Sequence, residues 1–104
     1  MTTKERIAII DGAGVRSVAE FWQLYLDRTK PDAPADFGRN LDALWDAIEG
    51  GGPGCPVEFD RLHFRNLAGV IEADPQGLAW FEGLQKIASD ATRIRITLSL
   101  GPAS

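Results

Sequence analysis

The sequence predicts a two-layer α/β domain in which a three-stranded parallel β-sheet is flanked by helices. Three short apolar segments have the character of strands, and helical segments separate them. Strands that alternate with helices are joined by right-handed crossovers, which produce a parallel sheet. A chain of 104 residues suits one hydrophobic core. We therefore treat residues 1–104 as a single domain.

The first strand is expected at residues 6–10, a β-branched apolar run that an Asp-Gly turn closes. Ser17 and Glu20 then have the spacing of a capping box, which starts a helix. This helix must stop before Pro31. Two prolines and a glycine exclude a regular helix or central strand at residues 31–38, so we expect an ordered loop there.

A second helix is expected at residues 41–49. Asn40 is of a type that caps helix N-termini, and Gly50 supplies the stop. The glycine-rich residues 50–54 then form a flexible connector. It leads to a second strand at residues 57–62, where apolar and polar side chains alternate.

The last third of the chain supplies further helix and the third strand. A short helical turn is expected near residues 66–71, and Pro75 suits the first position of the helix that follows. Residues 93–99 alternate strictly, which predicts a strand with one buried face at a sheet edge. Residues 101–104 are expected to fray. The apolar face of the last helix is assigned by helical spacing to Leu78, Phe81, Leu84 and Ile87.

Negative charge is concentrated in one segment. The formal net charge is −4, and residues 31–50 contain five acidic side chains against the single base Arg39, so this segment accounts for all of it. Such a field disfavours nucleic acid and anionic membranes and favours basic proteins as partners. The alternative is an acidic face that only maintains solubility.

The second predicted helix gathers these charges on one face. At about 100° per residue, Asp42, Asp46 and Glu49 point one way, whereas the leucines point toward the core. Trp45 lies on the border between the two faces. Because like charges at i and i+4 weaken a helix, stability gives no reason for Asp46. Carboxylates beside an aromatic ring do suit the capture of cationic side chains.

Residues 37–46 read Phe-Gly-Arg-Asn-Leu-Asp-Ala-Leu-Trp-Asp, and with the following Gly50 they resemble the signature of the barstar family. A weaker resemblance covers residues 10–12, 56–59 and 94–99, in the expected order along the chain. The resemblance implies a three-stranded parallel sheet with flanking helices. It also implies an inhibitor that covers the active site of a ribonuclease with this helix and the preceding loop.

The resemblance further implies where the partner binds. Asp46 matches the aspartate that occupies the phosphate site of the nuclease. Three departures leave the identity of that nuclease open: Asp36 replaces an aromatic residue, Gly51 replaces a tryptophan, and Lys86 falls where the family has a contacting glutamate, with Glu82 one turn earlier as a possible substitute. The candidate partner-binding residues are Asp36, Phe37, Gly38, Asn40, Asp42, Trp45, Asp46, Glu49 and Gly50.

The function we predict is that of a non-enzymatic immunity protein from a toxin–antitoxin pair, monomeric when free and bound one-to-one to a basic ribonuclease. The apolar residues 7–10 are too few for a membrane span or signal peptide, and the single Cys55 permits no internal disulfide, so a cytoplasmic location is expected. The first alternative is a regulatory module that binds a non-nuclease basic protein. A hydrolase that uses Asp42 or Asp46 as general base is disfavoured, because neither has a nucleophile or acid beside it.

No cofactor or metal is expected. His63 is the only histidine and matches no metal-ligand spacing, and Cys55 lacks an adjacent base that would activate its thiol. The glycine run at residues 50–54 is not followed by the Lys-Ser or Lys-Thr pair of a phosphate-binding loop.

Overall fold

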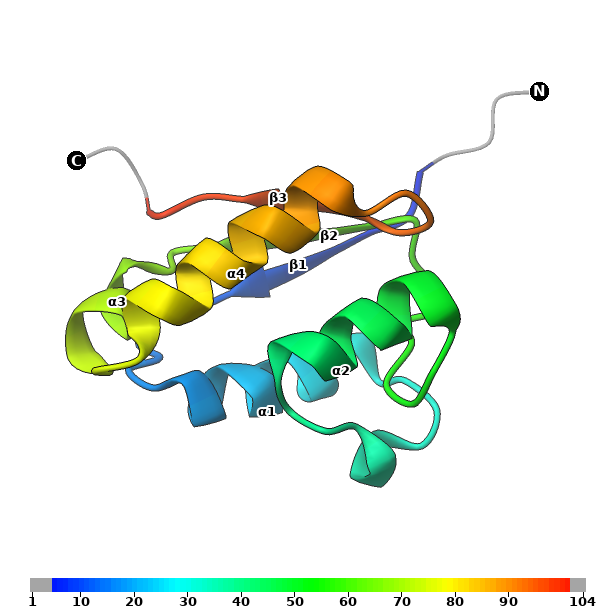
Figure 1. Ribbon diagram of the computed structural model, residues 1–104, viewed down its shortest axis with the longest axis horizontal. Helices are drawn as coiled ribbons and strands as arrows, with labels where there is room; N and C mark the ends of the chain where they lie inside the picture. The colour runs from blue at the N-terminus through cyan, green and yellow to red at the C-terminus, as the bar shows by residue number, and fades with distance from the viewer. Residues whose placement is uncertain (1–4, 102–104) are drawn as a thin grey trace.

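A three-stranded parallel sheet forms one layer of the molecule, as the computed structural model of residues 5–101 shows (Figure 1). The strands are β1 (Ile7–Asp11), β2 (Arg61–Arg65) and β3 (Arg95–Leu98), in the order β1-β2-β3. In the central strand, Leu62 is in register with Ala8 on one side and Ile96 on the other. The sheet confirms the predicted fold class and the edge position of the last strand.

The helices form the second layer, along one side of the sheet (Figure 1). They are α1 (Val18–Thr29), α2 (Leu41–Trp45), α3 (Ala68–Ala73) and α4 (Gly77–Asp90). A single turn of 3-10 helix, Pro34–Asp36, precedes α2, and a π-helical turn, Asp46–Gly50, continues it; below, α2 includes this turn. On β1, the alternate residues Ala8 and Ile10 are buried while Ile7 and Ile9 are exposed. Only one face of β1 therefore packs against the core.

An aromatic cluster joins α1 to the sheet and to the loop before α2. The Phe21 ring packs edge to face against Phe64 of β2, with ring centroids 5.2 Å apart. The ring of Phe37, only 4% exposed, lies against the rings of Trp22 and Tyr25. Phe37 thus anchors the loop to the core and fixes where α2 begins.

Local capping explains where α1 starts. Ser17 Oγ accepts a hydrogen bond from the Glu20 amide at 3.1 Å, as the capping-box pattern predicts. The Glu20 carboxylate reaches back to the Arg16 amide instead of that of Ser17. The helix ends at Thr29, before Pro31, because Lys30 adopts a left-handed conformation.

The second strand lies four residues later than predicted. Val57 is 63% exposed, residues 57 and 58 form a turn and Asp60 a bend, so residues 56–59 do not form part of a strand. Apolar and polar side chains alternate both in residues 57–62 and in residues 61–65. The second of these stretches forms the strand, and its apolar side chains, Leu62 and Phe64, are fully buried. Residues 51–60 instead form a ten-residue connection from α2 to the sheet.

The last long helix also differs from the prediction. α4 begins at Gly77 instead of Pro75, and Leu78, which was assigned to the buried face, is 59% exposed, whereas Leu84 and Ile87 are buried as predicted. At Gly77 a β-carbon would overlap the backbone of α3, so glycine allows the two helices to touch. This contact turns Trp80, Leu84 and Ile87 toward the core and Leu78 away from it. Of the tail expected to fray, residues 102–104 lie outside the described residues.

Candidate protein-binding site

The start of α2 is built by Asn40, which acts as the predicted N-cap. Its Oδ1 accepts a hydrogen bond from the Ala43 amide at 2.7 Å, and its Nδ2 donates to the Gly38 carbonyl. Arg39, just before the cap, has a positive φ of 52°. Asn40 therefore links the loop to the first turn of the helix, while its side chain remains exposed.

The two faces of α2 are those that helical spacing predicted. Leu44 is fully buried and Ile48 is 1% exposed, while Asp42 and Asp46 are exposed. Trp45 lies on the border and is 38% exposed. The helix thus presents two carboxylates and part of an indole ring to solvent.

The end of the helix is wider than an α-helical turn. From Asp46 to Gly50 the chain forms a π-helical turn, and Gly51, with a φ of 72°, ends it. The stop lies one residue after the predicted Gly50. The amides of Gly51 and Gly52 both donate to the Asp46 carbonyl, so these two bonds fasten the chain after the helix to Asp46.

Negative charge at Asp46 gains little from its surroundings. The side chain lies in the last turn of the helix, where the helix dipole disfavours an anion, and Asp42 is one turn away. The four ion pairs found within residues 5–101 include neither carboxylate. A cationic partner would relieve both repulsions.

The carboxylate of Glu49 is engaged inside the fold. It accepts hydrogen bonds from the Arg93 amide and from the amide and hydroxyl of Thr92. These bonds hold the pKa of the Glu49 carboxyl below its ordinary value, and the bond from the Arg93 amide has the largest effect. Glu49 therefore ties the end of α2 to the segment before β3, a role that the sequence pattern did not indicate.

This contact predicts a pH-dependent contribution to stability. Because the folded-state pKa of Glu49 is lowered, its contribution is complete above the ordinary value of 4.5 and is lost as the pH falls through the folded-state value. We expect Glu49→Gln to have a lower Tm than wild type near neutral pH, with the two proteins converging as the pH falls through the folded-state pKa of Glu49. Thermal unfolding followed by circular dichroism measures both.

Glu82→Gln is the matched control for that experiment, because Glu82 is an exposed glutamate on α4. It should leave Tm close to that of wild type near neutral pH. A Glu49→Gln variant with the wild-type Tm at neutral and at acidic pH would show that the hydrogen bonds to Thr92 and Arg93 contribute nothing to stability.

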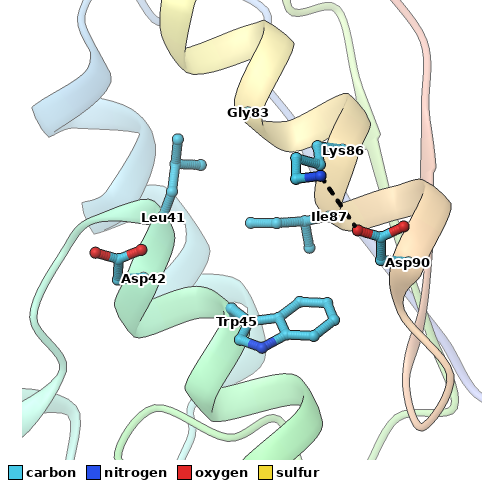
Figure 2. A pocket seen from close by; sticks show the side chains of 7 residues that line it. All are labelled: Leu41, Asp42, Trp45, Gly83, Lys86, Ile87 and Asp90. Carbon is cyan, nitrogen blue, oxygen red and sulfur yellow. Dashed lines mark ion pairs between the residues drawn. The ribbon is translucent and has the colours of Figure 1, made fainter.

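A groove runs between α2 and α4, beside the acidic face (Figure 2). Its volume is about 460 Å³. A β-carbon at Gly83 would overlap the Leu41 side chain, so this glycine lets the two helices approach closely. Figure 2 shows Asp42 and Trp45 on one wall and Lys86 on the other, where the Lys86 ammonium lies 3.8 Å from an Asp90 oxygen. The rim of the groove therefore carries both signs of charge.

The structure brings the candidate binding residues together but divides them by exposure. Phe37 is buried, and the side chains of Asn40 and Glu49 are used in internal hydrogen bonds. The groove residues on α4 were missed except for Lys86; Gly83, a glycine inside a helix, is the signal that was available. The candidates that are exposed and whose side chains form no internal hydrogen bond are Asp36, Gly38, Asp42, Trp45, Asp46 and Gly50.

His63 and Cys55, which were considered as metal ligand and reactive thiol, lie in surroundings that do not favour these roles. His63 Nδ1 lies 2.7 Å from Thr97 Oγ1 on the neighbouring strand. Burial raises the pKa of the Cys55 thiol, the opposite of what a reactive thiolate requires. Within residues 5–101, no three His, Cys, Asp or Glu side chains form a possible metal site. In the same part of the chain, every helix is too short or too polar to cross a membrane.

The fold and the acidic helix together define a small α/β domain built to bind another protein. The family described as Barstar (barnase inhibitor) matches residues 5–99, nearly the whole chain, and the protein belongs to this family. Its members are inhibitors rather than enzymes. Among curated proteins, none matches the chain.

Proposed function

We propose that this protein inhibits a basic ribonuclease by inserting α2 and the preceding loop into the active site of the enzyme. In this complex the Asp46 carboxylate occupies the site of an RNA phosphate. Active sites that bind RNA are rich in lysine, arginine and histidine, because they must neutralise phosphates. A carboxylate on a rigid helix can accept charge-assisted hydrogen bonds from the same side chains.

The observation that carries this proposal is the exposed pair Asp42 and Asp46 on α2. Neither forms an ion pair within residues 5–101, and Asp46 lies at the negative end of the helix dipole. The fold thus keeps two carboxylates where they repel each other. Trp45 beside them supplies an aromatic surface for a cationic side chain.

The candidate residues then divide into two roles. The exposed Asp36, Gly38, Asp42, Trp45, Asp46 and Gly50 contact the nuclease. Phe37, Asn40 and Glu49 hold the loop and helix in position through the contacts described above. The inhibitor is monomeric when free, binds one-to-one, and acts in the cytoplasm as the antitoxin to a ribonuclease toxin.

The test begins with a pull-down from the native host, using the tagged full-length protein. We expect it to recover a basic ribonuclease. Adding purified inhibitor to that enzyme should abolish RNA cleavage with an end point near one inhibitor per enzyme, because the active site is covered. Cleavage of a fluorogenic RNA substrate measures the titration.

Two other outcomes would contradict the proposal. If the pull-down recovers a basic protein without nuclease activity, the chain is a regulatory module that uses the same acidic face. If the purified chain itself turns over RNA or an ester, and Asp46→Asn abolishes that activity, it is a hydrolase.

A further inference from the structure

Two glycines after α2 lie against the carboxylate of Asp46. A β-carbon on Gly50 would lie 2.8 Å from Asp46 Oδ1, too close for two non-bonded atoms, and a β-carbon on Gly52 would overlap Asp46 Oδ2. The carboxylate is therefore folded back over the chain at the end of the helix. A side chain at either position would displace the carboxylate from this orientation.

Backbone conformation does not explain these two glycines. In the same run, Gly51 and Gly54 have positive φ values of 72° and 86°, which favour glycine. Gly50 and Gly52 are not among the glycines with positive φ. For Gly52, the nearest atoms to an added β-carbon all belong to Asp46.

We infer that Gly50 and Gly52 are positioning residues that hold the Asp46 carboxylate in one orientation for the partner. This inference rests on the proposed function. The amides of Gly51 and Gly52 donate to the Asp46 carbonyl, so the chain that carries the glycines is fastened to the residue it positions. A side chain at position 52 would push the carboxylate into another rotamer and redirect its charge.

A carboxylate held in place before binding loses less rotational freedom when it meets the enzyme. The two glycines therefore allow the Asp46 carboxylate to keep one orientation before the partner binds.

The first test is Gly52→Ala in the free protein. Because the atom in the way is the end of a flexible side chain, the fold should tolerate the change and Tm should stay near that of wild type. NMR scalar couplings should show a changed Asp46 χ1 population. Affinity for the nuclease recovered by pull-down should fall on the order of tenfold, as for coupled neighbours.

Gly50→Ala is a second variant, and unlike Gly52→Ala it is expected to raise the stability. Alanine favours helix over glycine, so Tm should rise while binding weakens. Gly51→Ala is the control for backbone strain and should lower Tm because of its positive φ. Lower affinity together with higher stability in Gly50→Ala cannot come from a damaged fold.

A double-mutant cycle with Asp46→Ala decides whether the glycines act through the carboxylate. In the Asp46→Ala background, Gly52→Ala should cause no further loss of affinity. An equal loss in both backgrounds, or an unchanged Asp46 χ1 population, overturns the inference and leaves the proposed function intact. Wild-type affinity in Asp46→Ala alone overturns both the proposed site and this inference.

Discussion

Asp46→Ala is expected to weaken nuclease binding by at least about 30-fold, which corresponds to roughly 2 kcal/mol, the usual threshold for a central interface residue. Its stability should be unchanged or slightly higher, because the repulsion from Asp42 is removed and the helix end loses an unfavourable charge. Isothermal titration calorimetry gives the affinity. Urea denaturation gives the free energy of unfolding.

Asp32→Ala is the matched control, since Asp32 is an exposed aspartate in the loop before α2. We expect it to act as a peripheral charge that alters mainly the association rate. If Asp46→Ala binds like wild type while Lys86 or His63 substitutions abolish binding, the interface is on another face of the molecule.

Leu44→Ala is expected to have the reverse effects. Leu44 is fully buried on the core face of α2, so truncation leaves a cavity and should lower the free energy of unfolding by roughly 2 to 5 kcal/mol. The molecules that remain folded should still bind, because Leu44 is not part of the exposed face. Urea denaturation and calorimetric binding, corrected for the folded fraction, measure the two effects.

Leu78→Ala provides the control with the same chemical change. Leu78 is 59% exposed, so its loss should change the free energy of unfolding by no more than about 0.5 kcal/mol. Equal destabilisation by both substitutions would mean that α2 is not packed through Leu44 as described.

Much of the fold and the orientation of α2 could be predicted because the relevant signals are local. The cap at Asn40 and the spacing of Leu44 and Ile48 depend on residues within three turns of one helix. The same spacing put Asp42 and Asp46 on the exposed face, and the structure agrees.

The errors arose where distant residues decide the structure. Residues 57–62 and residues 61–65 both have the alternating pattern of a strand. Only the second stretch, with Leu62 and Phe64, pairs with β1 and β3. Helical spacing allowed Leu78 into the core, but the close contact of Gly77 with α3 rotates it outward.

The sequence did not indicate that Glu49 and Phe37 are engaged inside the fold, because their partners are distant along the chain. The hydrogen bonds that the Glu49 carboxylate accepts come from Thr92 and Arg93, more than 40 residues away. The aromatic partners of Phe37 lie on α1. An acidic helix in a sequence shows which charges exist, whereas tertiary contacts determine which of them remain available to a partner.

The pairing of β1 with β2 joins residues 54 positions apart, such as Ile7 and Arg61, and α2 lies within the loop that this pairing closes. Helices shorter than about 12 residues are marginal alone in water, and α2 with its π-helical turn spans only residues 41–50. We therefore expect the acidic surface to depend on the long-range strand pairing. Under the proposed function, we expect a nuclease titration to count the natively folded molecules, with no inhibition from a partly folded chain.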